Sequence, residues 1–221
     1  MTTTSARIAP RIATGGAPLT RAKAAMILLH GRGATAEGML DLAEVFAQPD
    51  MAYLAPQAPG RTWYPHSFLA PIEQNEPHLS RALAQVDALV GELGHNGFAP
   101  EKVVLLGFSQ GGCLALEYAA RNARRYGAVI GLSAGLIGPE GTPRDYRGSL
   151  AGTRVVLGCS DIDAHIPLAR VKETTRVLGA LGGDVVERIY PGMGHTINDD
   201  EIAQVRAALA GLLHPAPSPA Q

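Results

Sequence analysis

The chain has 221 residues, a formal net charge of −1 and an aromatic content of 5%. This length suits a single large domain over residues 1–221, because α/β folds often exceed 200 residues without dividing. Near-neutral charge and few aromatic side chains argue against a nucleic-acid partner. The N-terminus has no signal-peptide pattern, and no apolar stretch of about 18 residues exists. With only two cysteines, we therefore expect a cytoplasmic protein without a disulfide framework or stable membrane insertion.

Strand-like and helix-like segments alternate along the chain, which predicts an α/β fold with a mostly parallel sheet and helices on both faces. The first predicted strands cover 8–13 and 25–29, with a turn at Gly15 and Gly16 between them. A helix over 36–47, a short strand over 51–54 and an amphipathic helix over 79–93 follow. Further strands are predicted over 103–108, 128–132, 154–158 and 185–190, and further helices over 168–181 and 202–213. The Pro-rich tail 215–221 cannot continue a helix, and we expect it to be frayed.

The most informative segment is the apolar strand 103–108, which runs into Gly107-Phe108-Ser109-Gln110-Gly111 and a helix-forming stretch. In α/β hydrolases a strand, G-x-S-x-G and helix form a nucleophile elbow, which exposes the serine hydroxyl at the carboxyl edge of the sheet. By composition, such a pattern arises by chance in about one chain in ten, so the flanking elements carry the prediction. The alternative is that Ser109 merely caps a helix. We predict that Ser109 is a nucleophile.

A serine nucleophile needs a base to accept its proton and an acid to orient that base. In α/β hydrolases these follow in the order Ser, acid, His. His195 lies in a Gly-rich loop after the last predicted strand and is the candidate base. Asp161 and Asp163 both follow the strand 154–158, and spacing alone does not choose between them as the acid. Together with His165 they also allow a metal site. No other histidine pair has ligand spacing, so we expect no metal and no organic cofactor.

The segment His30-Gly31-Arg32-Gly33 follows another predicted strand. This is where an α/β hydrolase takes one backbone N–H of its oxyanion hole, here from Arg32, with the second from Gln110 after the nucleophile. Two fixed donors aimed at a developing oxyanion lower a barrier by several kcal/mol. The alternative is a Gly-rich connection with no role in the reaction.

With H-G-x-G, G-F-S-Q-G-G, D-x-x-I-P and G-x-G-H in this order, the chain resembles the phospholipase/carboxylesterase branch of the α/β hydrolases from about residue 26 to 213. The resemblance implies an α/β-hydrolase fold without a large lid domain. It assigns the acid to Asp163, four residues before Pro167, in preference to Asp161. It also implies a small-molecule ester substrate and allows a homodimer.

The chain departs from the acyl-protein thioesterases of this branch at two places. An apolar residue usually stands at the position of Arg32, whose cation could favour an anionic substrate, pair with an acid or lie in solvent. The loop that starts at Trp63 also differs, so acyl-chain preference does not carry over. Trp63, Phe68 and Leu69 either wall an acyl pocket or pack on the core.

These features predict a serine carboxylesterase that hydrolyses small to medium esters through an acyl-enzyme. Ser109 would attack the carbonyl, His195 would move the proton and Asp163 would orient His195. Lysophospholipase or acyl-protein thioesterase activity is the alternative within the fold. A hydrolase fold used as a non-catalytic binding module is the alternative from another class.

Overall fold

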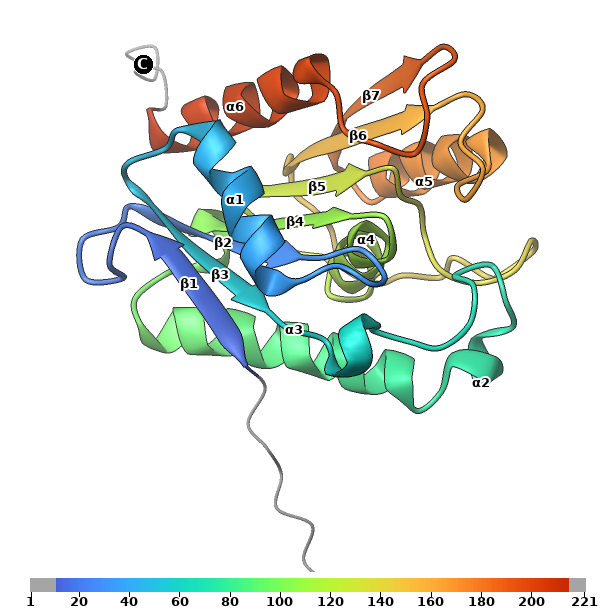
Figure 1. The fold of residues 1–221 in the computed structure, drawn as a ribbon, viewed down its shortest axis with the longest axis horizontal. Helices are drawn as coiled ribbons and strands as arrows, with labels where there is room; N and C mark the ends of the chain where they lie inside the picture. The colour runs from blue at the N-terminus through green and yellow to red at the C-terminus, as the bar shows by residue number, and fades with distance from the viewer. Residues whose placement is uncertain (1–10, 215–221) are drawn as a thin grey trace, which may run out of the picture.

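The computed structural model of the protein describes residues 11–214. Seven strands form one sheet in the order β1-β3-β2-β4-β5-β6-β7, and only the β1–β3 pair is antiparallel. The strands are β1 (Ile12–Gly16), β2 (Ala24–Leu29), β3 (Met51–Pro56), β4 (Val103–Phe108), β5 (Ala128–Leu132), β6 (Arg154–Ser160) and β7 (Asp184–Tyr190). The mostly parallel sheet that alternation predicted is confirmed (Figure 1).

Helices cover both faces of the sheet (Figure 1). On one face, α1 (Ala36–Phe46) and α6 (Asp199–Leu213) pack against alternate side chains of the strands; on the other lie α3 (His78–His95), α4 (Gln110–Arg121) and α5 (Leu168–Ala180). Strands β2 and β4 are buried along most of their length. Double burial explains why their sequences are continuous apolar runs and do not alternate with polar residues.

Several predicted boundaries differ from the structure. The first strand was predicted from residue 8, but residues 8–10 lie outside the described part of the chain, and β1 continues through Gly15 and Gly16, where we predicted a turn. Pairing with β3 extends it, since Gly16 lies opposite Ala52. The last helix was predicted from residue 202 but begins at Asp199. There Asn198 and Glu201 form a reciprocal capping box that sequence periodicity does not report.

Two long connections leave the carboxyl edge of the sheet. The first, between β3 and α3, contains a 3-10 turn (Pro59–Arg61) and the short helix α2 (Ile72–Asn75), neither of which we predicted. The second joins β5 to β6 and is tied to the first where the Gly138 N–H donates to the Phe68 carbonyl at 2.7 Å. The second connection starts at the carboxyl edge and returns to the opposite edge, where Gly148 pairs with Ala123 after α4, and neither connection forms a large lid domain.

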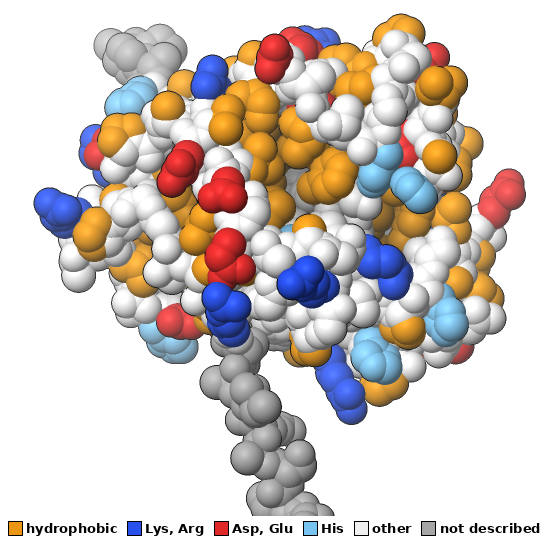
Figure 2. Space-filling view, in the orientation of Figure 1, with side chains coloured by type: hydrophobic (Ala, Val, Ile, Leu, Met, Phe, Trp, Pro, Cys, Tyr) orange, Lys and Arg blue, Asp and Glu red, His pale blue; other side chains and the backbone are white. Residues whose placement is uncertain are grey.

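The surface and the helices bear on the partner predictions. On the face seen in Figure 2, acidic and basic side chains are interspersed, and apolar side chains gather beside α1 and α6. Among the helices of residues 11–214, none is both long and apolar enough to cross a membrane. The predicted tail 215–221 lies outside the described residues.

Candidate active site

Ser109 sits at the turn between β4 and α4 with φ 53° and ψ −122°, a conformation that costs a non-glycine residue about 1–3 kcal/mol. Two glycines make this turn possible. A Cβ on Gly107 would lie 2.3 Å from the Gly111 carbonyl group, and a Cβ on Gly111 would lie 2.1 Å from the Leu29 carbonyl oxygen. The strand, the turn and the helix therefore pack too closely for any side chain at these positions, and Ser109 is held at the carboxyl edge.

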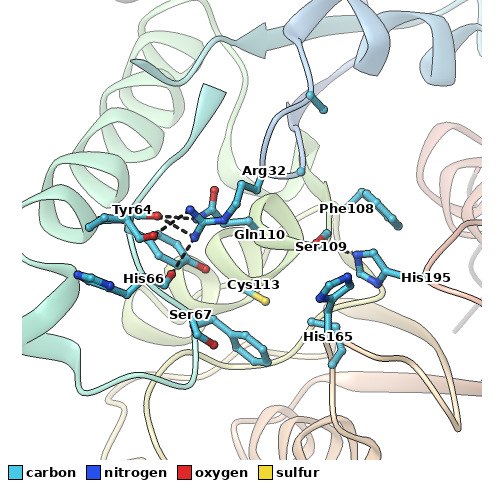
Figure 3. Close-up of a pocket in the computed structure, with 15 residues that line it drawn as sticks. Arg32, Tyr64, His66, Ser67, Phe108, Ser109, Gln110, Cys113, His165 and His195 are labelled. Carbon is cyan, nitrogen blue, oxygen red and sulfur yellow. Dashed lines mark hydrogen bonds between the residues drawn. The ribbon is translucent and has the colours of Figure 1, made fainter. Parts of the chain in front are cut away.

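His195 lies in the loop that joins β7 to α6, at the same edge of the sheet as Ser109. Its Nε2 is 2.9 Å from Ser109 Oγ (Figure 3). Its Nδ1 is 2.7 Å from Asp163 Oδ2. A carboxylate can only accept, so Nδ1 carries the proton and Nε2 is left to accept from the serine hydroxyl. Phe108 and His165 flank the imidazole ring at centroid distances of 4.9 and 4.8 Å.

The Asp163 side chain is fully buried in the loop after β6. Burial would raise the pKa of this carboxyl, but hydrogen bonds from His195 and from the His165 and Ile166 N–H groups lower the pKa below its ordinary value. Asp163 therefore remains an anion, as a partner for an imidazolium requires. Its neighbour Asp161 has a different contact: its Oδ1 accepts from the Gly192 N–H at 2.8 Å.

In the structure, the two aspartates that allowed a metal site have different partners. Asp163 faces His195, whereas Asp161 faces Gly192. Within residues 11–214, no group of three or more His, Cys, Asp and Glu side chains is placed to hold a metal ion.

Arg32 lies in the loop after β2, and this loop runs beside Ser109. A Cβ on Gly31 would lie 3.5 Å from Ser109 Cβ, so the two loops are in contact. Gln110 is the first residue of α4, where a backbone N–H has no acceptor within the helix. Among the hydrogen bonds of the described chain, the Arg32 N–H also has no backbone acceptor. Two donors are thus available on either side of Ser109.

Arg32 is an exposed residue, but its side chain is bound to the backbone and does not pair with an acid. Its guanidinium donates to the carbonyl oxygens of Tyr64 (3.0 Å), Pro65 (2.9 Å) and His66 (2.8 Å) (Figure 3). Within residues 11–214, no carboxylate lies within ion-pair distance of it. Arg32 therefore binds the backbone of the loop between β3 and α3.

A cavity of about 510 Å³ opens onto Ser109 and His195. Such a volume lies within the range that small-molecule sites span. Phe68 lines the cavity, whereas Trp63 and Leu69 do not. Trp63 is only 3% exposed and instead packs on His30, to whose carbonyl its Nε1 donates at 2.8 Å. Leu69 packs on the hydrophobic core.

Sequence reasoning missed several residues of this site. His165, His66, Tyr64 and Cys113 also line the cavity. Cys113 lies one helical turn after Ser109, a spacing that could have indicated its place. His30 lies behind the site: its Nδ1 donates to the Gly31 carbonyl and its Nε2 accepts from the Ala58 N–H. Burial lowers the pKa of His30, so this imidazole remains neutral.

The strand order and the Ser109–His195–Asp163 geometry define an α/β hydrolase. The sequence profile of the phospholipase/carboxylesterase family matches residues 16–213. The chain therefore belongs to this family of esterase- and thioesterase-type hydrolases. Acyl-protein thioesterase 1 of Gibberella zeae is 28% identical over 96% of this chain and 98% of its own. Lysophospholipase-like protein 1 of Mus musculus is 24% identical over 86% and 87%.

Solved structures agree with this assignment. A phospholipase/carboxylesterase from Dyadobacter fermentans is 43% identical and superimposes with a TM-score of 0.88, covering 91% of this chain and 97% of that chain. The esterase PE8 is 25% identical with a TM-score of 0.77, covering 93% and 100%. The predicted family and the α/β-hydrolase fold are confirmed.

Proposed function

We propose that the protein is a serine carboxylesterase that hydrolyses small to medium carboxylic esters through an acyl-enzyme. The observation that carries this proposal is the continuous hydrogen-bonded chain Asp163–His195–Ser109 at the cavity, with distances of 2.7 and 2.9 Å. In this geometry Ser109 attacks the ester carbonyl while His195 takes its proton, and Asp163 stabilises the imidazolium. The amides of Arg32 and Gln110 would hold the oxyanion.

The rest of the cycle needs only these groups and water. His195 returns the proton to the alcohol, which leaves as the tetrahedral intermediate collapses to the Ser109 ester. Water then attacks this ester while His195 takes a proton from the water. His195 next gives that proton to Ser109 Oγ as the second tetrahedral intermediate collapses, and the acid product is released. No metal or organic cofactor enters the proposal.

The cavity supports the proposed size of the substrate. Tyr64, Phe68 and Ile166 line it with apolar surface, and its volume of about 510 Å³ would hold a short or medium acyl group. The names of the relatives, acyl-protein thioesterase 1 and lysophospholipase-like protein 1, support the second candidate, cleavage of a thioester or a lysophospholipid.

The test is hydrolysis of p-nitrophenyl esters from acetyl to palmitoyl, with Ser109→Ala as control. We expect activity to peak at short chains, to survive a chelator and to fall by about 10⁶-fold in Ser109→Ala. A peak at long chains would move the assignment to the second candidate. A folded protein that neither turns over an ester nor is labelled by a fluorophosphonate would instead be a binding module.

A further inference from the structure

The side chains of the two proposed oxyanion-hole residues bind one carbonyl group. Gln110 Nε2 donates to the Tyr64 carbonyl at 2.8 Å, and Arg32 Nη2 donates to the same oxygen at 3.0 Å (Figure 3). Arg32 follows β2 and Gln110 starts α4, so these residues belong to elements far apart in sequence. The Tyr64 carbonyl thus connects the two segments whose backbone amides flank Ser109.

From this shared contact we propose that the Arg32 side chain is a positioning residue for the oxyanion hole. It fixes the Arg32 amide relative to the Gln110 amide through the loop residues 62–66. The inference rests on the proposed function, because it needs an oxyanion to act on. It assigns the Arg32 side chain a task separate from that of its own backbone N–H.

Hydrogen bonds hold loop residues 62–66 from both sides. Gln110 Oε1 accepts from the Trp63 N–H at 3.0 Å, so the side-chain amide of Gln110 binds the loop through both its oxygen and its nitrogen. The Arg32 guanidinium donates to three consecutive carbonyl oxygens of the loop, those of Tyr64, Pro65 and His66. A further bond, from the Gly33 N–H to the Arg61 carbonyl at 2.8 Å, ties the backbone beside Arg32 to the start of the same loop.

The chemistry of the guanidinium suits this task. Its donors lie in one plane in a fixed fork, so one side chain can bind three carbonyl oxygens at once. A lysine ammonium has no such fork and would keep the charge without the geometry. Because no carboxylate of residues 11–214 pairs with Arg32, the carbonyl contacts themselves set the position of its side chain.

Misplaced N–H donors of the oxyanion hole have a specific effect on the kinetic parameters. Oxyanion donors act on charge that develops in the transition state, so misplacing them lowers kcat while leaving KM nearly unchanged. A misplacement of about 1 Å can cost about 100-fold in rate. A merely structural role for Arg32 would lower thermal stability without this split between kcat and KM.

The experiment compares Arg32→Met and Arg32→Lys with the matched control Arg206→Ala. Arg206 also donates to a backbone carbonyl, that of Val45, but it connects α6 to α1 and does not line the cavity. The substrate is the neutral ester p-nitrophenyl acetate, so charge recognition does not contribute. The measurements are kcat, KM, the affinity for a trifluoromethyl ketone that forms a tetrahedral adduct, and kcat with added guanidinium chloride at millimolar concentration.

We expect both Arg32 variants to lose about tenfold to 100-fold in kcat, with a parallel loss of ketone affinity and little change in KM. Added guanidinium should restore part of the kcat of Arg32→Met, and Arg206→Ala should match the natural protein. If Arg32→Met does not fold, Arg32→Lys decides by the same readouts. Arg32 variants that keep the kcat and ketone affinity of Arg206→Ala would overturn the inference.

The design separates this inference from the proposed function. If the natural protein does not hydrolyse the ester faster than Ser109→Ala, the proposed function has failed, and the inference fails with it. If the natural protein is active and depends on Ser109 while the Arg32 variants behave like the control, only the inference has failed.

Discussion

The two walls of the cavity are held in different ways. The first, the strand-end wall, consists of Ser109, His165 and His195, which lie in the connections that follow the parallel strands β4, β6 and β7. The second, the loop wall, consists of residues 62–71, which contain no strand and are held by bonds from remote side chains to their backbone. Regular structure places the groups proposed to react, whereas individual side-chain contacts place the loop on the other side of the cavity.

After the loss expected for Ser109→Ala, the largest effect concerns Asp163, which contacts His195 of the strand-end wall. Asp163→Asn should lower kcat by about 10⁴-fold, because an amide does not hold His195 in the tautomer that accepts the serine proton. Asp161→Asn is the matched control, since an asparagine there still accepts from the Gly192 N–H. Steady-state kinetics with one ester would measure both. Equal losses in the two variants would show that Asp163 has no special role.

The next effect concerns the free energy of unfolding and its dependence on the buried residue Glu201. Glu201 is fully buried, and its Oε1 has no hydrogen-bond partner within residues 11–214. Burial raises the pKa of Glu201 from 4.5 to about 7. The folded state therefore keeps this proton where the unfolded chain loses it, and the free energy of unfolding falls as pH rises from about 4.5 to about 7.

Glu201→Gln removes this titration and keeps a side chain suited to the capping box. Relative to the natural protein, the variant should gain about 2–3 kcal/mol in the free energy of unfolding between pH 4.5 and pH 8. Urea unfolding at several pH values measures this difference. Parallel pH profiles for the two proteins would show that Glu201 titrates normally.

The smallest effect tests the loop wall. Buried Asn75 accepts from the His66 N–H at 2.8 Å and donates to the Ser67 carbonyl at 2.9 Å. Asn75→Ala should cost about 1–2 kcal/mol of stability and lower kcat/KM, because this part of the pocket loses its support. Asn96→Ala, at the exposed end of α3, is the control. An unchanged kcat/KM in Asn75→Ala would mean that the loop wall holds its shape without this side chain.

The same contrast explains which features the sequence could predict. Strands β4 and β5 begin and end at the predicted residues, because double burial leaves continuous apolar runs with clear ends. Ser109 and His195 could be proposed as site residues because each lies in the connection after a strand, whereas the choice of Asp163 over Asp161 needed the family resemblance; the roles of all three stay predictions. That residues 1–221 form one domain, and that the protein is cytoplasmic, stay predictions.

The loop wall was not predictable in the same way. Trp63 and Phe68 are aromatic residues of one loop, yet one packs on His30 and the other lines the cavity. That difference depends on bonds such as those of Arg32, which join residues more than 30 positions apart and follow no periodicity. The start of α6 was missed for a related reason, since a capping box, and not an apolar pattern, sets it.

The burial of the two cysteines has a practical consequence for spectroscopy. Cys113 and Cys159 are the only cysteines of the chain, and burial raises the pKa of each thiol to about 12. Because the thiolate is the form that attacks an alkylating reagent, neither cysteine should react with maleimides at neutral pH. A single reporter introduced by Glu73→Cys, on exposed α2, could therefore carry a fluorophore beside the pocket without any change to the native cysteines.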